Sequence, residues 1–108
     1  MIRKAKVYYN RIQAGILTKE GDKYFFRYED SYIDDTANPQ LSLSLPKQKE
    51  QFESNVLFPF FYGLLAEGEM KEIQCRKLKI DENDHFTRLI KTAYRDTIGA
   101  VTLEEVTE

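Results

Sequence analysis

The chain has 108 residues, enough to bury one hydrophobic core, and we expect a single domain over residues 1–108. A hydrophobic content of 42%, with seven Phe and seven Tyr, is typical of a folded globular chain and excludes a disordered one. The formal net charge is −2, from 16 basic and 18 acidic residues, so overall charge gives no basis for direct nucleic acid binding.

The first third of the chain predicts three antiparallel strands. Residues 4–9 and 12–18 are rich in side chains that suit a pleated, half-buried surface, and the polar pair Asn10-Arg11 separates them. A turn containing Gly21 then leads into a third apolar run at residues 23–28. These runs predict a three-stranded meander.

The following segment predicts a surface loop and then a fourth strand. Turn formers and acids dominate residues 29–40, where Tyr32-Ile33 is the one apolar anchor. The sequence Leu-Ser-Leu-Ser-Leu at residues 41–45 alternates at period two, which places three leucines on one face of a strand, and Pro46 ends it. Residues 47–54 are polar and predict a loop.

An aromatic-rich helix is predicted next. Five apolar residues follow the spacing of a core-facing helix: Leu57, Phe60, Phe61, Leu64 and Leu65. Pro59 must lie in the first turn, so we expect the helix to begin near Val56 or Leu57 and to end at Gly68.

The last third predicts two more helices and a returning strand. A helix with weak periodicity spans residues 69–79, and acids at residues 81–84 offer an N-cap for another helix. The core positions of that last helix are Phe86, Leu89, Ile90 and Ala93. A short strand is predicted at residues 99–103 and a frayed acidic end at 104–108. The fold class is therefore α+β: a small antiparallel sheet, made of a meander plus later strands, packed with about three helices.

The sequence carries no recognisable catalytic or cofactor-binding constellation. Cys75 and His85 are the only cysteine and histidine, and we interpret them as a half-buried thiol and a surface ring rather than a reactive pair. The acids at 81–84 are better helix caps than metal ligands, because the segment lacks the glycine and distal glutamate of a calcium loop. The five glycines are scattered, so no glycine-rich phosphate loop is present either. We expect no enzymatic activity, no cofactor and no metal.

The same residues indicate a cytoplasmic protein. Cys75 alone forms no intramolecular disulfide, and the first residues lack the apolar core of a signal peptide. No apolar run approaches the roughly 20 residues that a membrane span needs. We therefore expect no contact with a membrane.

Three motifs resemble, in order and spacing, the N-terminal domain of HipA-type serine/threonine kinase toxins. They are Leu-Ser-Leu-Ser-Leu-Pro at 41–46, Phe-Pro-Phe-Phe-Tyr-Gly-Leu-Leu-Ala-Glu-Gly at 58–68, and Arg-Asp-Thr-Ile-Gly-Ala-Val at 95–101. In that family the domain is an α+β cap ahead of the kinase lobes. Some operons carry the cap as a separate small protein, HipS, beside a shortened kinase, HipT, and a helix-turn-helix protein, HipB.

The resemblance implies that this chain is a HipS-like antitoxin. It would bind and inhibit a HipT-like kinase in trans, within a ternary complex that includes a HipB-like protein. We leave open a second interpretation, in which the cap stabilises the kinase or bridges it to the HipB-like protein without neutralising toxicity. A third, an independent small enzyme, is disfavoured by the missing catalytic constellation.

Six residues are the predicted partner contacts. Phe58 and Tyr62 lie on the flank of the aromatic helix away from its core stripe, and exposed aromatic residues often anchor interfaces. The loop around Glu67, Gly68, Glu69 and Met70 joins two predicted helices. We expect it to reach toward the kinase's nucleotide or substrate cleft, with the two glutamates facing cationic phosphate-binding residues. Arg95-Asp96 more simply forms a structural turn.

Overall fold

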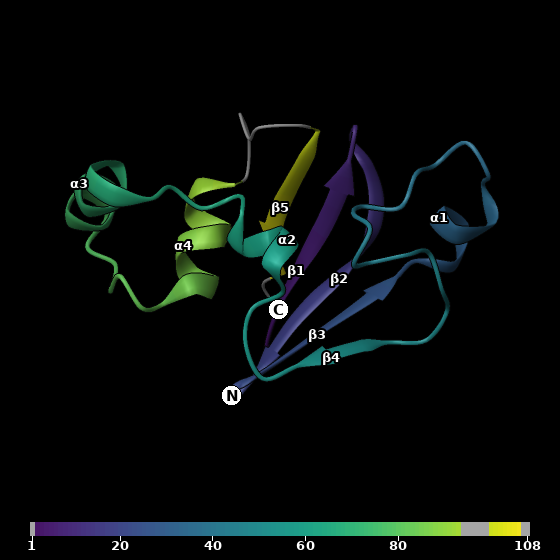
Figure 1. The fold of residues 1–108 in the computed structure, drawn as a ribbon, viewed down its shortest axis with the longest axis horizontal. Coiled ribbons are helices and arrows are strands. Elements are labelled where there is room, and N and C mark those ends of the chain that lie inside the picture. The colour runs from purple at the N-terminus through teal and green to yellow at the C-terminus, as the bar shows by residue number, and fades with distance from the viewer. Residues whose placement is uncertain (1, 94–99, 107–108) are drawn as a thin grey trace.

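The computed structural model describes residues 2–93 and 100–106. It shows a five-stranded antiparallel sheet in the order β4-β3-β2-β1-β5, and α2 and α4 lie against one face of that sheet (Figure 1). The strands are β1 (Ile2–Tyr9), β2 (Ile12–Glu20), β3 (Lys23–Tyr28), β4 (Phe52–Ser54) and β5 (Val101–Glu105). The helices are α1 (Asp30–Asp34), α2 (Pro59–Tyr62), α3 (Gly68–Leu78) and α4 (His85–Thr92). The predicted α+β class is confirmed.

The meander of β1, β2 and β3 is confirmed, and short turns set its register. Asn10 and Arg11 both adopt positive φ, at 49° and 70°, which matches the twist of a two-residue hairpin. Gly21 takes a φ of 59° in the second turn. Side chains that alternate along these strands enter the core on the helical side: Ala5, Val7, Leu17, Tyr24, Phe26 and Tyr28.

Of the two edge strands, the sequence predicted β5 but not β4. β5 confirms the predicted returning strand and pairs with β1, with Leu103 opposite Val7. The chain is not frayed from Glu104 as expected, because β5 continues to Glu105 and the Val106 amide donates to the Lys4 carbonyl at 2.9 Å. β4 was not predicted, since its three residues lie in a polar stretch and are ordered by pairing with β3.

The predicted strand at residues 41–45 is wrong. The segment is a turn closed by an isolated bridge between Ser42 and Leu45, and its leucines do not share a face, because Leu43 is 92% exposed and Leu45 1%. The buried Tyr28 hydroxyl fixes this turn by accepting from the Leu41 amide at 2.9 Å and donating to the Leu45 carbonyl. Because β4 occupies the free edge of β3, this segment has no strand to pair with.

A short helix, α1, lies where a surface loop was expected. Its buried Tyr32 stacks on Tyr28 with ring centroids 5.8 Å apart and donates to the Pro39 carbonyl at 2.6 Å. Tyr32 and the partly buried Ile33 thus form the predicted apolar anchor, although they do so from a helical turn.

The predicted last helix is confirmed as α4. Asp84 caps it by accepting from the Thr87 amide at 3.1 Å, and Phe86, Leu89, Ile90 and Ala93 are all buried. Within the described ranges, no helix has both the length and the apolar character that crossing a membrane requires.

Candidate partner-binding surface

The local sequence around Pro59 delays the start of the aromatic helix. A residue before proline is pushed out of the α region, and Phe58 is extended, with φ −55° and ψ 137°. Helix α2 therefore begins at Pro59 and not near Val56 or Leu57, and Gly63 ends it after only four residues. The predicted core stripe is nevertheless largely confirmed, with Leu57, Phe61 and Leu65 buried.

The two aromatic residues predicted to flank this helix have different environments. Phe58 is only 7% exposed, and its ring packs edge-on against Phe61 with centroids 6.3 Å apart. The expectation that Phe58 is exposed is wrong, because its extended backbone turns the ring into the core. Tyr62 is 41% exposed and packs edge-on against His85 at 5.2 Å. Tyr62 is thus available at the surface.

The four predicted contacts at residues 67–70 lie together at the start of α3. Gly68 has a φ of 60° and opens α3, so it does not end the preceding helix as expected. Glu67, Gly68, Glu69 and Met70 are all exposed, and Met70 has an exposed fraction of 57%. We call these four residues the α3 turn.

A buried arginine fixes the segment that leads into the α3 turn. Arg88 of α4 is 3% exposed, and its Nη2 donates to the Ala66 carbonyl at 2.8 Å. Since α4 belongs to the core, this bond holds the α3 turn in a defined position relative to the sheet. A cation withdrawn from water makes strong hydrogen bonds to the carbonyl groups it meets.

Helix α3 itself confirms the predicted second helix but stands away from the sheet (Figure 1). Cys75 is its one buried residue, whereas Met70, Ile73 and Leu78 are 57%, 36% and 47% exposed. Helix α3 thus leaves three large apolar side chains exposed to water along its 11 residues.

A groove adjoins Tyr62 on the same side of the molecule and encloses about 750 Å³. It forms where the turn between β2 and β3, the segment between β4 and α2, and the start of α4 meet. The residues that line it are Lys19, Asp22, Tyr24, Asn55, Val56, Leu57, Pro59, Tyr62, Gly63, Asn83 and His85. Of these, sequence reasoning identified only Tyr62 as a contact, because the others come from separate segments that only the fold brings together.

Two titratable rings in this groove are held in their neutral forms. Burial, with the nearby Asp84 and Asp22 carboxylates, raises the pKa of Tyr24 above its ordinary value. Burial lowers the pKa of His85, and the Arg88 and Lys71 cations lower it further, against an opposing effect of Asp84. Nδ1 of His85 is buried without a hydrogen-bond partner in the described part of the chain.

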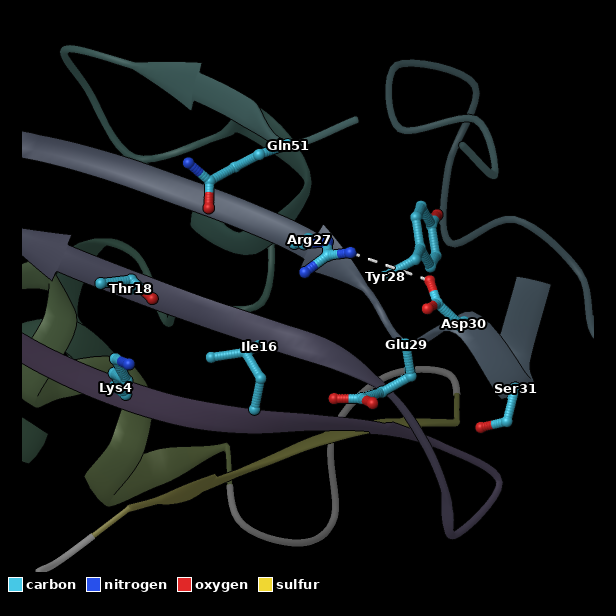
Figure 2. A pocket seen from close by; sticks show the side chains of 9 residues that line it. All are labelled: Lys4, Ile16, Thr18, Arg27, Tyr28, Glu29, Asp30, Ser31 and Gln51. Carbon is cyan, nitrogen blue, oxygen red and sulfur yellow. Dashed lines mark ion pairs between the residues drawn. The ribbon is translucent and has the colours of Figure 1, made fainter. Parts of the chain in front are cut away.

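The opposite face of the sheet carries a smaller, polar hollow of about 310 Å³ (Figure 2). Arg27 and Asp30 cross one side of it, with 3.9 Å between guanidinium and carboxylate. Among residues 2–93 and 100–106, no three His, Cys, Asp or Glu side chains are grouped so that they could hold a metal ion. The described residues that line the hollow include no histidine or cysteine. Its second acid, the half-buried Glu29, accepts a hydrogen bond from Gln13 Nε2 at 3.1 Å.

The sequence model of the HipA N-terminal domain matches residues 5–104. The chain belongs to the HipA N-terminal domain family. A solved structure described as the N-terminal domain of HipA toxin has the same fold, with a TM-score of 0.75 and 29% identity, and the match covers 100% of this chain and 96% of that one.

Two curated relatives of this HipA N-terminal domain differ in length. An uncharacterized protein from Haemophilus influenzae (strain ATCC 51907 / DSM 11121 / KW20 / Rd) is 31% identical over 105 residues, which is 97% of this chain and 94% of the relative. Putative kinase Y4mE from Sinorhizobium fredii (strain NBRC 101917 / NGR234) is 33% identical over 78 residues, which is 72% of this chain but 18% of the kinase.

The three motifs that carry the HipA resemblance have different roles in the fold. The leucine–serine motif forms the turn fixed by Tyr28, and the aromatic motif runs from Phe58 through α2 to the start of α3. Arg95-Asp96 and Gly99 lie outside the described residues, and the third motif enters the structure at Ala100 and β5.

The lowered pKa of His85 predicts a loss of stability in mild acid. The unfolded chain takes up a proton at the ordinary histidine pKa of 6.5, whereas the folded chain resists protonation until a lower pH. The free energy of unfolding should therefore fall as the pH decreases below about 6.5. Urea unfolding at several pH values between about 7 and 5 measures this change in stability. NMR titration gives the pKa of His85 directly, because the chain has only one histidine.

The His85→Phe variant is the matched control for this prediction. It keeps a ring against Tyr62 and removes the unpartnered Nδ1, so it should be at least as stable at pH 7 and lose the histidine-linked part of the acid dependence. A folded-state His85 that titrates at or above 6.5 would contradict the prediction.

Proposed function

We propose that this chain is a HipS-like antitoxin subunit that binds a separate HipA-like serine/threonine kinase and inhibits it in trans. The family assignment supports a role in a HipA-type system. The match to 18% of a putative kinase further supports descent from a domain that is elsewhere joined to a kinase. A HipB-like DNA-binding protein would complete the complex.

The observation that carries the proposal is the exposure of the α3 turn. Glu67 and Glu69 have no side-chain hydrogen bond or ion pair within the described ranges, and Met70 is 57% exposed. Exposed side chains without such contacts are available to a partner. The bond from Arg88 to Ala66 supplies rigidity, so less conformational entropy is lost when a partner binds.

The chemistry of the α3 turn suits the phosphate-binding part of a kinase cleft. Such a cleft presents cationic groups to the nucleotide, and two exposed carboxylates are complementary to them. Met70 adds a flexible apolar side chain that adapts to an irregular surface. Occupation of the cleft would exclude nucleotide or substrate, and this would inhibit the kinase without chemistry by the chain itself.

Co-expression tests the proposal. The kinase of the same operon should arrest growth when expressed alone, and this chain should relieve the arrest when it is added. If only the HipB-like protein relieves the arrest, the chain is instead a structural cap or bridge. If the purified chain does not bind the kinase, neither function holds.

Replacing Glu67, Glu69 and Met70 together by alanine should weaken kinase inhibition by at least about tenfold, equivalent to about 1.4 kcal/mol of binding free energy. The thermal unfolding curve should not change, because all three side chains are exposed. Autophosphorylation of the purified kinase, titrated with each variant, measures the inhibition.

A second triple variant is the matched control. Glu20, Glu50 and Leu43 are also two acids and one apolar residue, all exposed, and they lie outside the α3 turn. Their replacement by alanine should leave inhibition unchanged. If the two triple variants inhibit the kinase equally well, the α3 turn is not part of the interface.

A further inference from the structure

We propose that the groove beside Tyr62 is a second docking site, which receives an uncharged, apolar segment of the kinase polypeptide. This inference rests on the proposed function and identifies a contact separate from the α3 turn. It concerns a surface that arises only in the folded chain.

The groove combines a rigid floor with an exposed apolar rim. Tyr24 and Leu57 form part of the floor and are only 7% and 5% exposed, so they are fixed by the core. On the rim, Val56 is 68% exposed and Tyr62 41%. Covering such side chains stabilises a complex because apolar surface leaves water.

The charges of the groove favour an uncharged occupant. Lys19 and Asp22 are its one cation and one anion among the described lining residues, and both come from the region of the turn between β2 and β3. Their charges balance, and the His85 ring adds none near neutral pH. A strongly charged segment would lose its hydration in this groove, and no net opposite charge would offset that cost.

Two carboxamides supply the hydrogen-bonding groups that a polypeptide needs. Asn55 follows β4 and Asn83 precedes α4, and both residues are exposed. Neither side chain makes a hydrogen bond within residues 2–93 and 100–106. Each carboxamide has an NH₂ group that can donate to the C=O groups of an extended peptide, and an oxygen that can accept from its N–H groups.

The position of the groove indicates the kinase as the source of this segment. Gly63 lines the groove, and residues 64–66 connect it directly to the α3 turn. Figure 1 shows α2, α4 and α3 on the same side of the sheet. A partner seated on the α3 turn is therefore close enough to extend a segment into the groove. A volume of about 750 Å³ exceeds one side chain and suits a segment of a few residues.

Isothermal titration calorimetry with purified, catalytically inactivated kinase tests the inference. Val56→Asp places a charge on the apolar rim and should weaken binding at least tenfold. Tyr62→Lys, the second variant, should do the same. Leu43→Asp is the matched control, because Leu43 is 92% exposed and lies outside the groove, and it should bind like the wild type. Thermal unfolding establishes that each variant is folded.

The outcomes separate this inference from the proposed function. If the wild-type chain does not bind the kinase, both are overturned. If it binds and both groove variants bind equally well, the groove is not a kinase contact but the proposed function stands. If Val56→Asp instead abolishes self-association in sedimentation experiments and leaves kinase affinity unchanged, a second copy of this chain occupies the groove and the inference is wrong.

Discussion

Replacing Gly15 by valine should lower the free energy of unfolding by about 3 kcal/mol or more, because the side chain has no space. A Cβ atom at this position would lie 2.4 Å from the Arg27 carbonyl oxygen and 2.9 Å from the Phe26 ring. The carbonyl belongs to the neighbouring strand β3, so relief requires the strands to separate. Urea unfolding followed by circular dichroism measures the loss.

Gly63→Ala is the control for this substitution. Gly63 has a right-handed helical conformation, with φ −65° and ψ −14°, and its nearest atoms to an added Cβ lie 3.4 Å away. The change in stability should stay within about 1 kcal/mol, since alanine suits this conformation better than glycine does. A Gly15→Val variant as stable as Gly63→Ala would show that β2 and β3 pack more loosely than the structure indicates.

Replacing Phe61 by alanine should cost about 3–5 kcal/mol, the usual range for a phenylalanine removed from a core. Phe61 is fully buried and contacts three aromatic rings, Phe26, Phe58 and Phe60, at centroid distances of 5.5, 6.3 and 5.1 Å. Its removal leaves a cavity between α2 and the sheet. A typical domain has a total stability of about 5–15 kcal/mol, so this loss removes a large part of it and raises the ratio of unfolded to folded chains by roughly two to three orders of magnitude. Urea unfolding measures the loss.

Leu43→Ala is the control for the Phe61 variant. Leu43 is an equally apolar residue with an exposed fraction of 92%, so its truncation should change stability by less than about 0.5 kcal/mol. Chemical denaturation of both variants gives the comparison. Similar losses would mean that α2 does not belong to the cooperative core.

Local patterns predicted those elements whose sequence and packing agree. Strands β1 to β3 carry alternating apolar residues and short turns, and α4 has an acidic N-cap followed by apolar residues at helical spacing. The exposure of Tyr62 followed from helical spacing, and that of the α3 turn from its position between two predicted helices. In these segments, the apolar positions that the local pattern places on one face are the positions that the core buries.

The errors occur where a distant segment decides the local structure. Residues 41–45 have the pattern of a strand, but the edge they would need is taken by β4, and the Tyr28 hydroxyl bends them into a turn. β4 itself is ordered by its neighbour and not by its own three residues. Phe58 was misplaced because helical spacing was extended through the residue before Pro59. The groove was invisible in the sequence because three separate segments build it.

The pairing of β1 with β5 has a consequence for biosynthesis. β1 leaves the ribosome well before β5, yet one of its edges is paired by residues 101–105. Until those residues emerge, the nascent chain presents an open strand edge and lacks Val101 and Leu103, which complete the core. Closing so long a loop is also slow compared with forming the β1–β2 hairpin. Chains released before residue 101 should therefore be prone to aggregation and to proteolysis.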